Sequence, residues 1–401
     1  MISIRMLVMG MITFGALNTL VRKAQMVTCS KSDFPVDPVL SKDCPSVDEE
    51  PFNKPWIGNI FMFMGEMLLL AGLKGNRFLT SEVIIHPKPE LPAYYLLLPA
   101  SLDVLGSGVS GVGMMYISAS VWQMMRGSLI LFTAALSVIF IGRKLERQHI
   151  IGLSFATLGL GLVGVSSWLD SNDVPSLFSQ IYASASSSDA LLGIALTVLS
   201  QLCTAVQVVV EESLLKMTND TFCPPSPERV VAFEGLWGCL IMILVLLGLQ
   251  MTSGPDHGSA ENSIDSLQKL YNSSFLIFLV AVYLVSIAIF NVLGMKVSKH
   301  LSSVHRTLID SSRSVVVWAV QLVLWYLADS SIYGTPWTAN SWLQLLGFGF
   351  LVLGTLVYNE VIILVRTSQP EETTQSELVR MIDTARYRCP FTDCVLYMTQ
   401  T

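Results

Sequence analysis

The chain has 401 residues, of which 52% are apolar and only 13% are charged. Because about a quarter of the residues in an ordinary soluble protein are charged, this composition argues against a soluble fold, which could not cover its surface. The formal net charge is −6 and no basic run occurs along the chain, so nucleic acid is not an expected partner.

Runs of apolar residues, taken in chain order, decide the class of protein. A helix crosses the hydrocarbon core of a membrane with about 20 apolar residues. Ten such runs occur, near residues 4–21, 56–73, 94–116, 118–141, 150–168, 189–210, 229–250, 274–297, 303–327 and 341–365. The sequence therefore predicts an all-α membrane protein with ten transmembrane helices. The first run is also where a signal peptide would lie, but no small-x-small cleavage site follows it.

The third run contains the stretch LDVLGSGVSGVGMMY, residues 102–116, which matches the pattern G-x-G-x-x-G. A dinucleotide-binding turn places that pattern between a strand and a soluble helix, whereas here it lies inside a membrane span. Gly106 and Gly113 instead predict a helix face with little side-chain bulk, against which a neighbouring backbone can pack closely.

Short motifs of the first five runs return in the last five in the same order. DVLG at 103–106 returns as NVLG at 291–294, and QMMR at 123–126 returns as DSSR at 310–313. The matched positions include Glu66 with Glu234, Asp103 with Asn291, Gln123 with Asp310, Arg126 with Arg313, Gly152 with Gly347, and Gly159 with Gly354. Chance similarity between apolar segments is the alternative, but polar residues are rare inside spans.

The repeat predicts two homologous halves of five spans. Because five is odd, the halves enter the membrane from opposite sides, which is the inverted-repeat architecture of secondary transporters. In that architecture the binding site lies near the midplane, where the halves meet. The predicted halves are residues 1–170 and 189–366. The polar loop 22–54 and the tail 367–401 are expected to be extended or disordered.

The distribution of Lys and Arg predicts the orientation. With both termini in the cytosol, 15 of these residues face the cytosol and 6 face the opposite side, and the other three lie within or at spans. Cys29 and Cys44 then share a luminal or extracellular loop, where an oxidising compartment can join them. Two free cysteines are the alternative. No metal site is expected, because the remaining cysteines lack a second pair or a suitably spaced histidine.

Polar side chains inside spans are costly and usually face a cavity or one another. The candidates for binding substrate or protons are Glu66, Asp103, Gln123, Arg126, Glu234, Asn291, Asp310 and Arg313. Arg126 and Arg313 suit a substrate carboxylate or phosphate, and permanent ion pairs are the alternative. Asp310 can neutralise Arg313 on its own helix. Arg126 needs an acid from another helix, and Asp103 or Glu66 would serve.

Glu66 and Glu234 each have two interpretations. A buried glutamate tends to bind a proton and can carry it, whereas hydrogen bonding between helices is the alternative. The proton role is favoured for Glu66, which lies mid-span, and the packing role for Glu234, Asp103 and Asn291. Close helix packing is expected at Gly106, Gly113, Gly152, Gly159, Gly347 and Gly354.

Several motifs together point to a family. They are NTL at 18–20, MFMGE at 62–66, QMMRG at 123–127, FIGRKL at 140–145, EE at 211–212, EGLWG at 234–238, IDSSRSVVVW at 309–318 and LLGFGFLVLGTLVYN at 345–359. The chain resembles the F-type branch of solute carrier family 35, in the EamA-like drug/metabolite transporter superfamily. The resemblance implies a ten-helix inverted-repeat carrier with the fifth and tenth helices at the edge of a central cavity. It also implies an internal membrane, such as that of the lysosome, vacuole or Golgi.

Residues and resemblance together predict a secondary-active transporter of small organic solutes that works by alternating access. Four acids and two arginines in the spans favour a zwitterionic or cationic metabolite with proton coupling. A nucleotide-sugar antiporter is the alternative, and a channel or membrane adaptor is the alternative from another class. No enzyme is expected, because H-E-x-x-H, G-x-S-x-G and P-loop motifs are missing. No cofactor is expected. The expected partners are a small-molecule substrate and the lipid bilayer, and a second copy of the chain, forming a homodimer, is a further candidate.

Overall fold

A computed structural model of the chain describes residues 3–35, 44, 46, 48–73, 89–114, 116, 125–173, 187–218, 221–254, 256–327 and 334–362. These residues belong to one unit, Met1–Ile362. Gln123, the tail 367–401 and part of the loop 22–54 lie outside the described residues.

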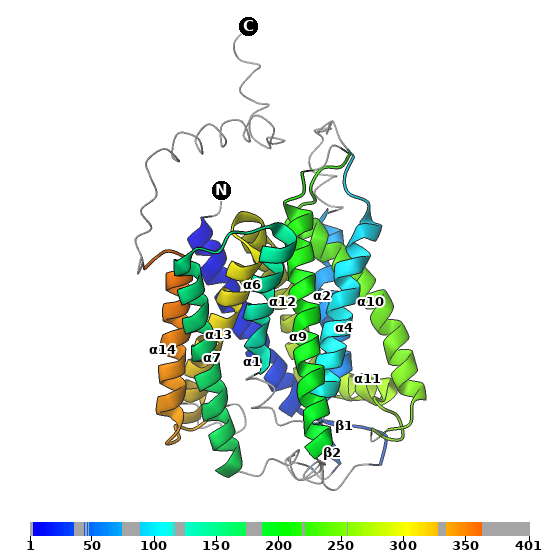
Figure 1. Cartoon of the computed structure of the whole chain (residues 1–401). Coiled ribbons are helices and arrows are strands. Elements are labelled where there is room, and N and C mark those ends of the chain that lie inside the picture. Colours follow the sequence, from blue (N-terminus) through cyan, green and yellow to red (C-terminus); the bar gives the residue numbers. More distant parts are fainter. Residues whose placement is uncertain are drawn as a thin grey trace, which may run out of the picture. The chain divides into compact units, whose positions relative to one another are not determined.

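Helices dominate the described part of the chain (Figure 1). In chain order the elements are α1 (Ile4–Val27), β1 (Cys29–Lys31), β2 (Glu49–Pro51), α2 (Pro55–Met67), η2 (Ala93–Leu96), α4 (Leu97–Met114), α6 (Ser128–Ile141), α7 (Arg147–Asp173), α9 (Ser187–Leu215), α10 (Pro227–Met251), α11 (Ser263–Asn272), α12 (Ser274–His300), α13 (Ser303–Leu327) and α14 (Ser341–Tyr358).

Membrane-spanning helices account for most of these elements. Within the described residues, nine helices are long and apolar enough to cross a membrane, which confirms the predicted all-α membrane protein. The predicted fourth span corresponds to α6, which is shorter, and residues 117–124 before it lie outside the described part.

Polar residues at the ends of the apolar runs start the helices. At the start of α10, Ser226 accepts a hydrogen bond from the backbone N–H of Arg229, and Pro227 follows it. At the start of α12, Ser273 accepts a hydrogen bond from the backbone N–H of Leu276. Such caps satisfy donors that a helix end leaves unpaired. The spans therefore begin where the sequence turns polar.

The first five spans pack against the last five in a matched way. α1 packs on α12 as α4 packs on α9, and α1 packs on α13 as α6 packs on α9. Likewise α2 contacts α12 as α4 contacts α10, while α2 packs on α10, α6 on α13 and α7 on α14. Exchanging the first span with the sixth, the second with the seventh, and so on, leaves this set of contacts unchanged.

Glycines bring the backbones of α7 and α14 together. A Cβ added to Gly159 would lie 2.5 Å from the carbonyl oxygen of Gly347, and one added to Gly354 would lie 2.6 Å from that of Gly152. Both distances are shorter than a carbon atom tolerates, so neither helix has room for a side chain at these points.

The contact between α4 and α9 is built in a similar way. A Cβ added to Gly106 would lie 2.9 Å from Oγ1 of Thr204, and one added to Gly113 would lie 2.7 Å from Oγ1 of Thr197. The glycine-rich stretch of the third span is therefore a packing surface.

A small cap covers the end of the bundle opposite the start of α1, and we call this end the cap end (Figure 1). β1 and β2 form an antiparallel pair, α11 contacts β1, and a disulfide joins Cys29 to Cys44. The sequence predicts an extended or disordered loop over residues 22–54. The described part of that loop instead contains the last turns of α1 and both strands, because the disulfide and buried ion pairs hold it in place.

These ion pairs join the loop after α1 to the segment before α12. Lys54 pairs with Asp256 and, at 2.7 Å, with Asp265. Lys269 pairs with Glu50 at 2.8 Å and with Asp265 at 2.9 Å. Both lysines are almost fully buried, so each ammonium group depends on its carboxylates for neutralisation.

The pKa values of two carboxyl groups in the cap are shifted in opposite directions. Burial alone would raise the pKa of Asp265, but the interactions with Lys54 and Lys269 hold it below its usual value. Burial raises the pKa of Glu261, and two hydrogen bonds from backbone N–H groups at the start of α2 offset this only in part.

Asp265→Asn should lower the stability of the folded protein by about 1–3 kcal/mol at neutral pH, because each of two buried ammonium groups loses one of its two carboxylate partners. The folded pKa of Asp265 is lowered, so its contribution is complete above the ordinary aspartate range and is lost as pH falls through the folded pKa. Thermal unfolding in detergent across pH should show the two proteins converging only in acid. Asp33→Asn, at an exposed position, is the control, and a pH-independent gap would contradict this account.

Gly159→Val should destabilise the protein by about 1–3 kcal/mol, because the new side chain collides with the backbone of α14. Gly161→Val is the matched control on α7, since a Cβ there meets nothing within 4 Å. Thermal unfolding of both variants in the same detergent measures the difference. Equal unfolding temperatures would show that α7 and α14 are not in close contact.

Candidate functional site

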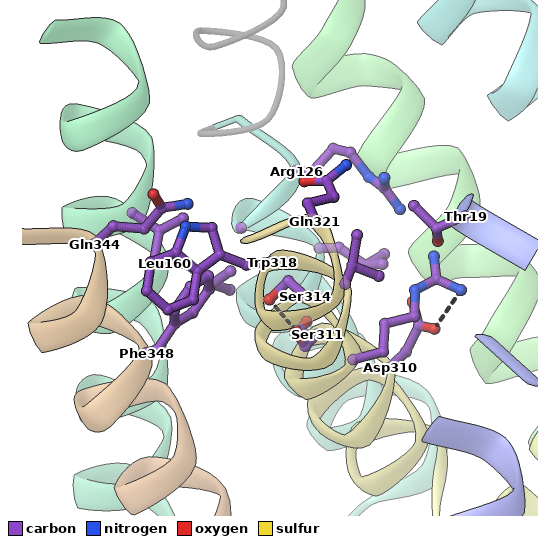
Figure 2. A pocket seen from close by; sticks show the side chains of 15 residues that line it. Thr19, Arg126, Leu160, Asp310, Ser311, Ser314, Trp318, Gln321, Gln344 and Phe348 are labelled. Carbon is purple, nitrogen blue, oxygen red and sulfur yellow. Dashed lines mark hydrogen bonds and ion pairs between the residues drawn. The ribbon is translucent and has the colours of Figure 1, made fainter. Parts of the chain in front are cut away.

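A cavity of about 170 Å³ lies where α1, α6, α7, α13 and α14 meet (Figure 2). We call it the arginine pocket. Its polar lining consists of Thr19, Arg126, Asp310, Ser311, Arg313, Ser314, Gln321 and Gln344. Helices from the first five spans and from the last five both contribute to the pocket, and Arg313 lies near the middle of α13.

Arg313 is held in place from two sides. Its Nη1 lies 3.1 Å from Oδ1 of Asp310 on the same helix, and its guanidinium group lies 5.2 Å from the ring centroid of Phe290, within cation–π range. A Cβ added to Gly15 would lie 2.9 Å from Cδ of Arg313. This glycine therefore gives α1 the room to pass beside the arginine.

Arg126 faces the same pair of charges. Its guanidinium group interacts electrostatically with Arg313 and with Asp310. The acid that interacts with Arg126 is therefore Asp310. The sequence predicts Asp103 or Glu66 for this role, but both lie in a different group of residues. The reason is that α6 packs on α13, which brings the two copies of the repeated motif together.

The two sides of the pocket differ in character. Figure 2 shows Arg126, Gln321 and Thr19 on one side of α13 and Trp318 on the other. The Trp318 ring packs against Phe348, with centroids 5.4 Å apart. The pocket thus combines two cations and one acid with an aromatic wall, a lining that can orient a solute by charge and cover its apolar part.

A second group of polar side chains lies within the spans. It contains the side chains of Glu66 on α2, Asp103 on α4, Glu211 on α9 and Glu234 on α10, and we call it the carboxylate cluster. The three glutamates are almost fully buried. The four carboxylates interact electrostatically with one another and with Arg306 of α13. Four helices thus place acidic groups around a single arginine.

Hydrogen bonds connect the cluster unevenly. Asn291 of α12 donates to Glu66, and Arg306 pairs with Glu211. Gln207 donates to Oε1 of Glu211 at 2.8 Å and is also hydrogen-bonded to Asp103. Among the described residues, the buried Oε1 of Glu234 has no hydrogen-bond partner.

The structure groups the sequence candidates into two sites. Arg126, Asp310 and Arg313 line the arginine pocket, while Glu66, Asp103, Glu234 and Asn291 meet in or beside the carboxylate cluster. Gln123 lies outside the described residues.

Sequence reasoning did not single out Glu211 and Arg306 as site residues. Arg306 lies in the first turn of α13, a position from which an arginine side chain commonly extends to the membrane interface. The doubled acid EE at 211–212, near the end of an apolar run, was the available signal. A charge at that position needs a partner from a neighbouring helix.

Glu212, the second acid of that pair, links α9 to α13 and to the loop that follows α6, at the end of the bundle where α1 begins. Its carboxylate accepts hydrogen bonds from Arg143 at 2.7 Å, from Lys216 at 2.8 Å and from the backbone N–H of Ser303 at 2.7 Å. Ser137 of α6 and Ser303 of α13 are also 3.1 Å apart. This network closes the bundle at that end.

Two groups of side chains in the described part have the ligand types of a metal site. Glu50, His257 and Asp265 converge in the cap, and Glu146, His149 and Glu360 converge at the other end of the bundle. In the cap, Lys269 already pairs with both carboxylates. A cation there would have to displace an ammonium group, so the cap triad is better suited to an ion-pair network.

Fold and buried polar groups together define a multi-pass membrane protein of the solute carrier class. Solute carrier family 35 member F6 from Homo sapiens is 30% identical over 357 residues, covering 87% of this chain and 86% of that protein. The mouse protein of the same name is 28% identical over 359 residues, and an uncharacterized protein from Schizosaccharomyces pombe is 29% identical over 272 residues. The chain therefore belongs to solute carrier family 35, in its F-type branch, as its motifs predict.

Two further comparisons complete this result. No family model matches the chain. A solved structure named only "Crystal structure of protein" superimposes with a TM-score of 0.52 over 88% of this chain and 96% of that one, at 11% sequence identity. At that identity the likeness concerns the fold alone.

Arg306→Ala should destabilise the protein by about 3–5 kcal/mol, because it leaves Glu211 buried without its counter-charge. Adding Glu211→Gln to that variant should restore part of the loss, since the orphaned charge is then removed. Thermal unfolding in detergent measures both variants, with Arg147→Ala at an exposed position as the control. A double variant less stable than Arg306→Ala would contradict the pairing.

Proposed function

We propose that this protein is a proton-coupled secondary-active transporter that carries a small organic solute by alternating access. The observation that carries the proposal is the arginine pocket, which draws its lining from the first five and the last five spans. A site between two repeats near the middle of the membrane is where such carriers bind their substrates.

The pattern of helix contacts supports a ten-helix inverted repeat, with α6 as the fourth span. The contacts that join the first five spans to the last five are unchanged when the two sets are exchanged. In addition, Glu66 and Glu234, which the repeat matches, interact across the contact between α2 and α10. Two interchangeable halves allow the pocket to face one side and then the other, whereas a channel or a passive adaptor has no need of them.

The lining of the pocket favours a zwitterionic solute over a cationic one. Two arginines and one aspartate give the pocket a net positive charge, because the other acids lie in the carboxylate cluster. The guanidinium groups suit a carboxylate, and Asp310 can accept an ammonium group. The volume of about 170 Å³ suits a solute the size of an amino acid better than a nucleotide sugar, since larger ligands occupy pockets of about 300–1,000 Å³.

We place both termini in the cytosol and the cap in the lumen of an endomembrane compartment. The excess of Lys and Arg on the side of the termini supports this orientation, and so does the disulfide in the cap, which needs an oxidising compartment. The Glu212 network then lies on the cytosolic side, where it holds α9 and α13 together.

Thermal unfolding of the purified protein with panels of amino acids, polyamines, cationic drugs and nucleotide sugars tests the substrate class. A zwitterionic compound should stabilise the protein by about 2.7 kcal/mol at a hundredfold excess over its Kd. Stabilisation by nucleotide sugars alone would overturn the zwitterion assignment. No stabilisation by any compound in detergent and in nanodiscs would count against a substrate pocket.

Arg126→Ala should abolish that stabilisation and the corresponding uptake into proteoliposomes while leaving a folded protein, because the carboxylate loses its binding partner. Arg126→Lys should restore part of the binding. Arg5→Ala, at an exposed position in the first turn of α1, is the control and should behave like the parent protein. Unchanged binding by folded Arg126→Ala would show that this arginine is structural.

A further inference from the structure

The carboxylate cluster has too many acids for its single cation. Glu211 is neutralised by its ion pair with Arg306, and Glu66, Asp103 and Glu234 remain. Among the described residues, the hydrogen bonds that these three side chains accept come from neutral amides, Asn291 to Glu66 and Gln207 to Asp103. Three negative charges in a low-dielectric interior repel one another and lose hydration worth several kcal/mol each.

Glu234 provides a second, independent observation. Its side chain is almost fully buried, and within the described part of the chain its Oε1 accepts no hydrogen bond. The next residue, Gly235, brings α10 against α2, because a Cβ there would lie 2.6 Å from Cβ of Glu66. An acceptor left unsatisfied beside another carboxyl group is the arrangement that a shared proton would complete.

We propose that Glu66, Asp103 and Glu234 form one proton-binding site, separate from the arginine pocket, in which the three carboxyl groups hold protons between them. A proton on Glu66 or Glu234 removes the repulsion between the two carboxylates and supplies the missing donor. The role of this site in driving transport rests on the proposed function, whereas the binding of protons does not.

Every helix packed around the site contributes a polar or titratable group. The groups that face Glu66 and Glu234 are Asp103 on α4, Glu211 on α9, Cys239 on α10, Tyr283 and Asn291 on α12, and Arg306 on α13. Arg306 is the cation of this set, and it is already paired with Glu211. The charge of the remaining three carboxyl groups is therefore controlled by protons.

A hydrogen-bonded route connects the site to the cytosolic end of the bundle. Asp103 is hydrogen-bonded to Gln207, and Gln207 donates to Glu211 at 2.8 Å. Glu211 pairs with Arg306 in the first turn of α13.

Infrared spectroscopy of the purified protein in nanodiscs tests the site directly, because a protonated carboxyl group has its own carbonyl stretching band. The parent protein should show this band near neutral pH. Glu66→Gln and Glu234→Gln should each lose part of the band, and the double variant should lose more. Glu261→Gln in the cap removes any contribution from that group, whose pKa burial raises. Glu228→Gln, more exposed and also on α10, is the matched control and should keep the band.

The outcomes separate this proposal from the proposed function. A band of undiminished intensity in the double variant, or a parent protein without the band, overturns the proton site even if a solute binds in the arginine pocket. Release of the protons on adding sodium ions at constant pH would show a cation site instead. If Glu66→Gln does not fold, Asp103→Asn gives the same test. Loss of the band in these variants supports the site even if no solute is found.

Discussion

The exclusion of water from the buried parts of the bundle and its cap is the constraint on which the rest of this structure depends. A charge placed there must meet a counter-charge, a set of hydrogen bonds or a proton. The chain satisfies this requirement differently in three places. The cap surrounds two lysines with acids, the arginine pocket offsets two arginines with one aspartate, and the carboxylate cluster gathers four acids around Arg306.

These three solutions have different consequences for function. In the cap both buried lysines have carboxylate partners, so their ion pairs are suited to holding the adjoining ends of α1, α2 and α12 in one arrangement. The arginine pocket keeps an excess of positive charge beside a cavity, so a solute with a carboxylate can complete its neutralisation. The carboxylate cluster keeps an excess of acid, which only protons or a cation can neutralise. The proposed coupling of a solute to protons would use these two incompletely neutralised sites.

Much of this organisation can be predicted from the sequence. The apolar runs predict the spans, and the matched polar positions identify Glu66, Glu234, Asp103 and Asn291 as related pairs. The division of the charges into two sites cannot be predicted, because it depends on which helices pack together. Arg126 meets Asp310 only because α6 lies on α13. The ordered structure of the cap cannot be predicted either, since Glu50 of β2 and Lys269 of α11 are far apart in the sequence.

The most direct test of alternating access is a measurement of distances between spin labels at both ends of the bundle. One label pair, at Phe140 on α6 and Ser213 on α9, reports on the end where α1 begins, and another, at Lys31 on β1 and Leu327 on α13, reports on the cap end. The account predicts two populations whose proportions shift with pH, with one distance increasing as the other decreases. Both distances staying fixed at every pH, with and without a stabilising solute, would contradict it.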